Sequence, residues 1–272
     1  MLNRIIDKIN KVIDYPIKTK SDLYPEFSNL VKEICESLSF IENSHPSLYN
    51  KFRNDQEQLL SKLDDKIIED EKNHETIIAN FMCGGKVLNE GEKTILSENK
   101  LFYTEYYRLL YFDERELLEQ SPKHICHIGC GPMPTSVLMW MKYTDAQITA
   151  IDYDRDAIEL AQLVFENWRH HKGVAIERAT FITEAGEYFD YAGIDLILLS
   201  SSILNKEDVY AAILNSITNT VNVIERIPHF LHDPRFRGSE ISEHYKLAAK
   251  ERNDMNLKLY QFPALNGEQH GK

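Results

Sequence analysis

The stretch His124-Ile125-Cys126-His127-Ile128-Gly129-Cys130-Gly131 decides the fold that the sequence predicts. A short apolar run leads into two glycines, and residues 135–143 follow with the composition of a buried helix. The order is that of a strand, a glycine turn and a helix. Because glycine tolerates positive φ, Gly129 and Gly131 would let a ligand lie against bare backbone at a helix N-terminus.

An acidic residue follows this turn at the end of the next apolar run. The next apolar run, residues 148–151, ends in Asp152, where dinucleotide-binding proteins carry the acid that binds ribose hydroxyls. Met133 and Pro134 occupy the place of the third glycine of those proteins, which argues against a pyrophosphate and therefore against NAD. A nucleoside without phosphates fits better, and S-adenosylmethionine is the common one. An ordinary strand-to-helix turn is the alternative.

Later strand ends supply further candidates for ligand contact. Glu184 and Ala185 follow the third predicted strand, where an acid could meet the adenine amine. The serines that begin with Ser200 and Ser201 follow the fourth, and simple turn chemistry explains them equally well. Arg226 ends the fifth run and could hold a carboxylate or form a surface ion pair. Two further acids, Asp154 and Asp156, are expected to start a helix, and the first is a reserve ligand.

Composition narrows the class of protein. The 272 residues are 43% hydrophobic, which suffices for a real core in one large or two modest domains. Asp and Glu outnumber Lys and Arg 43 to 31, so the formal charge is −12 and no basic block favours nucleic acid. No apolar run is long enough for a membrane span or a signal peptide, so we expect a cytoplasmic protein. A homodimer is compatible with the sequence, which carries no signal of oligomeric state.

The cysteines and histidines of the first strand invite a metal hypothesis. Cys126, His127 and Cys130 lie on a strand and its turn, where neighbouring side chains point to opposite faces. We therefore interpret the two cysteines as buried thiols and expect no metal. The pair His170-His171 has no further ligand at a matching spacing and is interpreted as a polar helix end.

The periodicity of the chain divides it into two parts. Residues 1–120 show helical spacing only, with helices expected over 2–13, 23–40 and 47–82, the last possibly broken once, and an aromatic segment over 93–119. From Pro122 onward, strands and helices alternate, which indicates a mostly parallel, doubly wound sheet. The sequence thus predicts an α/β protein with a helical N-terminal lid domain, 1–120, before a Rossmann-like domain, 121–272. After residue 240 we expect one more helix and a strand near 257–262.

Two segments together resemble a known family. The turn Ile128-Gly-Cys-Gly-Pro-Met-Pro134, which includes Pro132, resembles the Gly-x-Gly-Pro-x-Pro turn of nicotianamine synthases. Residues 103–118, with Tyr103 and Tyr107, resemble the tyrosine-bearing segment that precedes that turn. The resemblance covers residues 60–230 and extends to relatives such as staphylopine synthase.

The resemblance implies a class I methyltransferase-like fold with a helical lid, in which S-adenosylmethionine donates its aminobutanoyl arm instead of its methyl group. A lid glutamate of that family acts on the acceptor amine, and Glu71 is its nearest counterpart here, with Glu75 as a rival. A solvated face in an acidic run explains Glu71 equally well. The resemblance implies Tyr107 as its catalytic partner, and we name Tyr106 and Arg226 as candidate substrate-binding residues. Most other tyrosines of this segment should pack in the core.

The chemistry can be argued from the reactants. A sulfonium has three electrophilic carbons, and an enzyme selects one by placing a nucleophile in line with it. An amine is largely protonated at neutral pH, so a carboxylate must take its proton. We therefore predict a transferase of the 3-amino-3-carboxypropyl group to a small amine or amino acid. The alternatives are cyclisation of the donor to azetidine-2-carboxylate, methyl transfer to a small molecule, and a non-catalytic interaction protein on a Rossmann scaffold.

Overall fold

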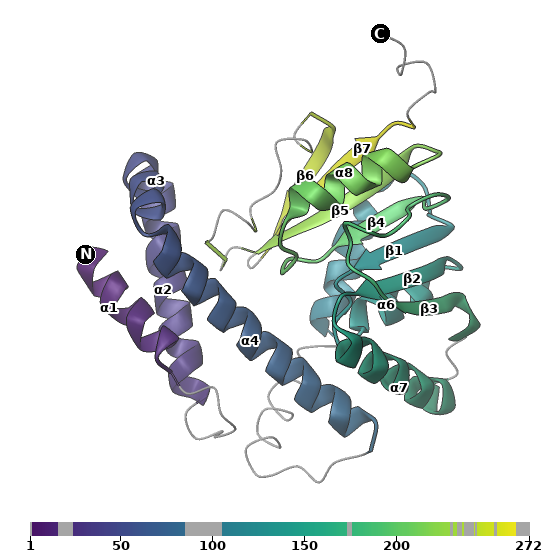
Figure 1. Cartoon of the computed structure of the whole chain (residues 1–272), viewed down its shortest axis with the longest axis horizontal. Helices are drawn as coiled ribbons and strands as arrows, with labels where there is room; N and C mark the ends of the chain where they lie inside the picture. The colour runs from purple at the N-terminus through teal and green to yellow at the C-terminus, as the bar shows by residue number, and fades with distance from the viewer. Residues whose placement is uncertain are drawn as a thin grey trace.

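The structure is a computed structural model that describes residues 2–15, 24–84, 105–172, 176–228, 231–232, 236, 242, 244–252 and 255–264. A group of helices precedes a seven-stranded sheet, as Figure 1 shows. Tyr103, part of the family resemblance, lies outside the described residues. Among the helices described, none has the length and apolar character of a membrane span.

Four helices form the N-terminal part of the chain. They are α1 (Leu2–Ile13), α2 (Tyr24–Ser44), α3 (Pro46–Asp55) and α4 (Glu57–Met82). The expected break in the long helical pattern falls at Gln56, between α3 and α4. The apolar stripes of these helices meet in one core, which also takes in Leu231 and Phe236 from the connection after β5. The sheet part of the chain therefore reaches back into the helical group.

The sheet follows the predicted alternation of strands and helices. Its strands are β1 (His124–Ile128), β2 (Gln147–Asp152), β3 (Ala179–Thr183), β4 (Leu196–Leu199), β5 (Val221–Pro228), β6 (Lys246–Glu251) and β7 (Met255–Phe262). Its helices are α6 (Thr135–Tyr143), α7 (Arg155–Lys172) and α8 (Lys206–Ser216), with a short 3-10 turn, η2 (Ile176–Arg178). A further helix, residues 105–116, lies just before β1 in the chain.

The strand order is β3-β2-β1-β4-β5-β7-β6. Strands β1 to β5 are parallel to their neighbours, and β7 pairs antiparallel with both β5 and β6. β1 has β2 on one side and β4 on the other. The direction in which successive strands are added therefore reverses between β1 and β4. Ligands of such sheets bind at the carboxyl ends of the strands beside this reversal.

Helices cover both faces of the sheet. On the central strands, alternate side chains enter different cores: Ile125 joins α6, α7 and the helix 105–116, whereas Cys126 joins α8. The predicted α/β class, a Rossmann-like class I methyltransferase fold with a mostly parallel doubly wound sheet behind an all-helical segment, is confirmed. Cys126 and Cys130 are buried free thiols, as predicted.

One element differs from the sequence prediction. The chain after residue 240 was expected to begin with a helix, but residues 246–251 form β6, the edge strand of the sheet. Four of the six residues of β6 are exposed and none is buried, because the strand is held by backbone pairing with β7 and covers little core. Charged residues with two alanines give such a strand the composition of a surface helix.

Candidate active site

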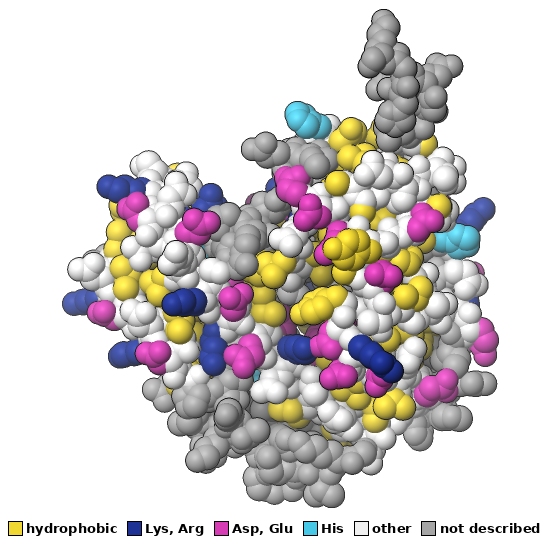
Figure 2. Space-filling view, in the orientation of Figure 1, with side chains coloured by type: hydrophobic (Ala, Val, Ile, Leu, Met, Phe, Trp, Pro, Cys, Tyr) yellow, Lys and Arg dark blue, Asp and Glu magenta, His cyan; other side chains and the backbone are white. Residues whose placement is uncertain are grey.

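A cavity of about 780 Å³ opens between α4, the helix 105–116 and the carboxyl ends of the parallel strands. In the space-filling view a hollow separates the helical group from the sheet part, with acidic side chains around it (Figure 2). The rival Glu75, the reserve ligand Asp154 and the twelve first choices from the sequence all line this cavity: Glu71, Tyr106, Tyr107, Gly129, Gly131, Pro132, Asp152, Glu184, Ala185, Ser200, Ser201 and Arg226. The fold thus collects residues that are up to 155 positions apart in the sequence.

The glycine turn forms the floor of the cavity. Gly129 has φ +74° and Gly131 has φ +63°, a conformation that glycine adopts without strain. The amides of Gly129 and Cys130 both donate to the carbonyl of Ile151, at 2.8 and 3.2 Å, which fixes the turn to β2. The sequence predicted bare backbone here. Both glycines line the cavity, and a Cβ at either would lie 2.6 Å from a side-chain atom, Ile203 Cδ1 at the first and Glu75 Oε2 at the second.

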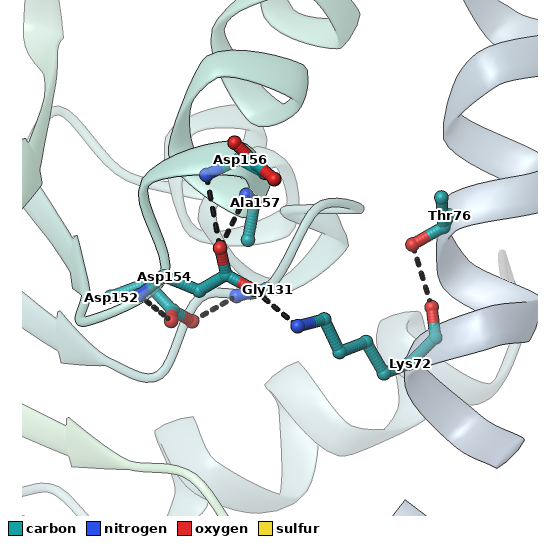
Figure 3. Close-up of polar contacts among 7 residues, drawn as sticks. All are labelled: Lys72, Thr76, Gly131, Asp152, Asp154, Asp156 and Ala157. Carbon is teal, nitrogen blue, oxygen red and sulfur yellow. Dashed lines mark hydrogen bonds and ion pairs between the residues drawn. The ribbon is translucent and has the colours of Figure 1, made fainter. Parts of the chain in front are cut away.

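Asp152 ends β2 and faces this floor. Its Oδ2 accepts from the amide of Gly131 at 3.0 Å, and its Oδ1 accepts from the amide of Asp154 at 3.0 Å (Figure 3). Burial raises the pKa of Asp152, and the two backbone hydrogen bonds oppose that rise. Each carboxylate oxygen retains acceptor capacity, so Asp152 can still accept hydrogen bonds from ribose hydroxyls.

Asp154 joins the two parts of the molecule. Its Oδ1 accepts from the amides of Asp156 and Ala157, at 3.0 and 3.4 Å, which is the helix-start role that the sequence predicted. Its Oδ2 forms an ion pair with Lys72 of α4 (Figure 3). The hydrogen bond from Lys72 lowers the pKa of Asp154. The one lysine among the cavity residues of the described chain is therefore paired with this carboxylate.

Two glutamates of α4, Glu71 and Glu75, lie one helical turn apart and line the cavity. The surrounding protein raises the pKa of both carboxyls. For Glu75 the effect of burial is strengthened by the charges of Glu71 and Asp152, so its pKa lies well above the usual range. Both side chains are partly buried and line the cavity.

The carboxyl end of β4 is fixed to the glycine turn through Ser200. The Ser200 hydroxyl donates its single proton to the carbonyl of Gly129, at 2.9 Å. The same hydroxyl lies 3.0 Å from Nε2 of His127, and Nη1 of Arg226 lies 3.5 Å from that nitrogen. Burial and the charge of Arg226 lower the pKa of His127 well below its usual value, so the ring is neutral. Ser200 thus serves the turn itself, and Ser201 lines the cavity beside it.

Arg226 is neither exposed nor at the surface. It is 4% exposed, and its Nε donates to Oε1 of Glu114 at 2.6 Å. The second oxygen of Glu114 accepts from the indole of Trp140 at 3.0 Å. The surface ion pair, one of the two alternatives for Arg226, is wrong, because the pair with Glu114 is buried and fixes the guanidinium in the cavity wall. Sequence reasoning missed Glu114, although it lies seven residues after Tyr107 and so on the same helix face.

The tyrosines of the helix 105–116 divide between the core and the cavity wall. Tyr111 is buried and stacks on Tyr143 with ring centroids 4.9 Å apart, which is core packing. Tyr106 and Tyr107 line the cavity, and their rings meet edge to face at 5.2 Å. The guanidinium of Arg252 lies 5.0 Å from the centre of the Tyr106 ring.

At the far side of the floor, the turn after β3 adds Glu184 and Ala185 to the wall. The amide of Glu184 donates to the carbonyl of Asp152 at 3.0 Å, so this turn is in register with the end of β2. Sequence reasoning missed Tyr153, which directly follows Asp152, lines the cavity and is 75% exposed. No group of His, Cys, Asp and Glu side chains within the described ranges is arranged as a metal site.

The architecture is that of the class I methyltransferase-like fold, with a group of helices before the sheet. Comparison with protein-family models and with curated proteins gave no match. Among solved structures, the chain is similar to those of MtNAS, a nicotianamine synthase. The complex of MtNAS with MTA and tNA superposes with a TM-score of 0.71 at 15% identity, over 96% of this chain and 97% of that one.

A second MtNAS structure is a glutamate-to-glutamine mutant in complex with S-adenosylmethionine. It superposes with a TM-score of 0.67 at 15% identity, over 95% of this chain and 98% of that one. The likeness therefore spans the helical part as well as the sheet. The resemblance predicted from the glycine turn is confirmed at the level of the fold.

Proposed function

We propose that this protein is an S-adenosylmethionine-dependent 3-amino-3-carboxypropyl transferase that acts on a small amine or amino acid and releases methylthioadenosine. The observation that carries the proposal is the composition of the two cavity walls. One wall holds a glycine turn and an acid suited to an adenosine, and the other presents carboxylates suited to an amine. The similarity in fold to MtNAS, solved with S-adenosylmethionine and with MTA, supports it.

The adenosine would lie along the strand ends. Asp152 faces the cavity with acceptor capacity for the ribose, and Glu184 stands at the next strand end for the adenine amine. Gly129 and Gly131 of the glycine turn, with Pro132 after them, would contact the ligand from the floor of the cavity. The remaining contacts of this set would come from Ala185, Ser200 and Ser201.

The acceptor amine would be activated by Glu71. The amine nitrogen attacks the γ-carbon of the donor, the carbon–sulfur bond breaks, and sulfur keeps the electron pair as a neutral thioether. The proton of the amine passes to the Glu71 carboxylate. Because burial raises the pKa of Glu71, this carboxylate is a stronger base than a solvated one. Tyr107, on the helix across the cavity, would help to close the site against water.

Arg226 and Tyr106 would bind the substrate. Glu114 fixes the guanidinium of Arg226 in the wall, where its positive charge suits the carboxylate of an amino acid or of the aminobutanoyl arm. Tyr106 lies beside it in the wall, against the apolar cluster of Leu110 and Met255. The proposed partners are thus small molecules. Cytoplasmic location and a homodimer stay predictions from the sequence.

Incubation with S-adenosylmethionine, with and without a panel of amines and amino acids, tests the proposal. We expect methylthioadenosine and a product enlarged by the aminobutanoyl group, both only when an acceptor is present. Methylthioadenosine without acceptor would indicate cyclisation to azetidine-2-carboxylate, and S-adenosylhomocysteine would indicate methyl transfer. A chain that neither binds nor consumes the donor would be a non-catalytic protein. Each of these three outcomes contradicts the proposal.

A further inference from the structure

Glu75 occupies a special place in the cavity. Its Oε2 lies 2.6 Å from the point where a side chain on Gly131 would begin. The amide of the same glycine donates to Oδ2 of Asp152 at 3.0 Å. A carboxylate of α4 and a carboxylate of β2 therefore meet over one residue of the glycine turn.

Among the described residues, no lysine or arginine is among the main influences on the pKa of Glu75, and the charge of Lys72 is the smallest of the influences on the pKa of Asp152. The electrostatic influences on Glu75 are those of Glu71 and Asp152, which are both negative. Lys72, between the two glutamates in sequence, forms its ion pair with Asp154 instead (Figure 3). Arg226 is paired with Glu114. Carboxylates held close together in a protein interior need a positive charge or a proton between them.

The chemistry of the donor decides which positive charge this is. If Asp152 binds the ribose, as the proposed function requires, the nearest charge of S-adenosylmethionine is the sulfonium, because its sulfur is bonded to the 5′ carbon of that ribose. The ammonium lies three carbons further along the arm. From the position of its carboxylate over Gly131, beside Asp152, we infer that Glu75 binds the sulfonium of the donor and so selects the charged donor over neutral thioethers.

The spacing of the two α4 glutamates fits the movement of charge in the reaction. Before transfer the positive charge is on sulfur, and after attack it is on the acceptor nitrogen. Glu75 and Glu71 are four residues apart, so their Cβ atoms are separated by about 5–6 Å on one helix face. One carboxylate would face the charge before transfer, and the other would face it afterwards. Methylthioadenosine, a neutral thioether, loses the attraction of Glu75, which favours its release.

Calorimetric titration of three ligands tests the inference. S-adenosylmethionine has a sulfonium and an ammonium, S-adenosylhomocysteine has only the ammonium, and methylthioadenosine has neither. For Glu75→Gln we expect the Kd of S-adenosylmethionine to rise by about tenfold or more, with those of the two thioethers within about twofold of wild type. Glu71→Gln is the matched control, one turn away on the same helix, and should bind S-adenosylmethionine with nearly wild-type affinity. Thermal denaturation with and without ligand checks that each variant is folded.

Three results would overturn the inference. Equal weakening of S-adenosylmethionine and S-adenosylhomocysteine in Glu75→Gln would mean that Glu75 contacts the ammonium or the shared adenosine. Wild-type affinity for S-adenosylmethionine with lost turnover would make Glu75 the base. Wild-type affinity for S-adenosylmethionine together with wild-type turnover in Glu75→Gln would mean that Glu75 has neither role. All three leave the proposed function standing, whereas a wild-type chain that binds none of the three ligands would remove the proposed function itself.

Discussion

The two walls of the cavity are built on different principles. On the sheet side, Asp152, Gly129 and Ser200 all have hydrogen-bond partners within the strand ends and turns. On the helical side, Glu71 and Glu75 face like charges, and the lysine between them is paired elsewhere. The polar groups named on the sheet side thus have partners within that wall. The other wall holds neighbouring carboxylates whose charge a cationic ligand would neutralise, and we therefore propose that the chemistry takes place at α4.

Contacts along the whole of α4 hold the second wall against the first. Near its start, Asp64 accepts from the amide of His232 at 2.7 Å, in the connection that follows β5. In its middle, Lys72 pairs with Asp154, and at its last residue the carbonyl of Met82 accepts from the side chain of Asn167 on α7. Figure 1 shows α4 running from the helical group to the side of α7. The wall is thus positioned by the sheet domain and by the helical core together.

The largest effect is expected from neutralising the proposed base, Glu71. Glu71→Gln should lower turnover by about 10²–10⁴-fold, because general-base catalysis contributes that much, while S-adenosylmethionine still binds. Steady-state kinetics and calorimetry on the same preparation check both halves. Turnover at the wild-type rate would remove Glu71 from the mechanism.

A change in the sheet wall should lower the affinity for the donor. Asp152→Ala removes the acceptor for the ribose and leaves the amide of Gly131 without its partner, so we expect donor affinity to fall by about 10–100-fold. The matched control is Asp156→Ala, four residues further on, which is exposed and does not line the cavity. Calorimetry should show unchanged affinity for the control. Equal losses in both variants would contradict a specific role for Asp152.

Two glycines separate the energetic cost of a positive φ from the cost of a side-chain clash in the glycine turn. Gly129 and Gly193 have nearly the same φ, +74° and +76°, but a side chain would clash with Ile203 at the first and meet nothing within 4 Å at the second. Gly193→Ala should cost about 1 kcal/mol of unfolding free energy through backbone strain alone, and Gly129→Ala about 2–3 kcal/mol. Urea denaturation measures both. Equal costs would show that Ile203 moves away freely.

The smallest effect concerns pH and the α4 wall. Burial, followed by the charge of Glu71, raises the pKa of Asp70 to about 7. A carboxyl whose pKa is raised on folding stabilises the fold most below its unfolded pKa, and this contribution is lost as the pH rises toward 7. Asp70→Asn should therefore be more stable than wild type at pH 8 by about 1–2 kcal/mol, and less so at pH 5. Urea denaturation at both pH values checks this, and a gap independent of pH would contradict it.

How much the sequence could predict follows the same division. The strand, turn and helix of 124–143 were predicted to the residue, because local apolar runs and glycines determine them. Strand β6 was not predicted, since pairing with β7 holds it and its own side chains give no strand pattern.

In the site, residues at strand ends could be nominated because a parallel sheet brings those ends to one edge. Side-chain contacts between distant elements could not be. The ion pair of Arg226 with Glu114, 112 positions away, and the placement of Glu75 over Gly131 depend on how helices pack on the sheet. Residue spacing carries no signal for either contact.

The measurement that tests the central claim most directly is a crystal structure of the protein with S-adenosylmethionine bound. We expect the ribose hydroxyls on Asp152, the sulfur beside Glu75, and the aminobutanoyl arm directed between Glu71 and Tyr107. A donor found outside this cavity, or one whose ribose makes no contact with Asp152, would contradict it.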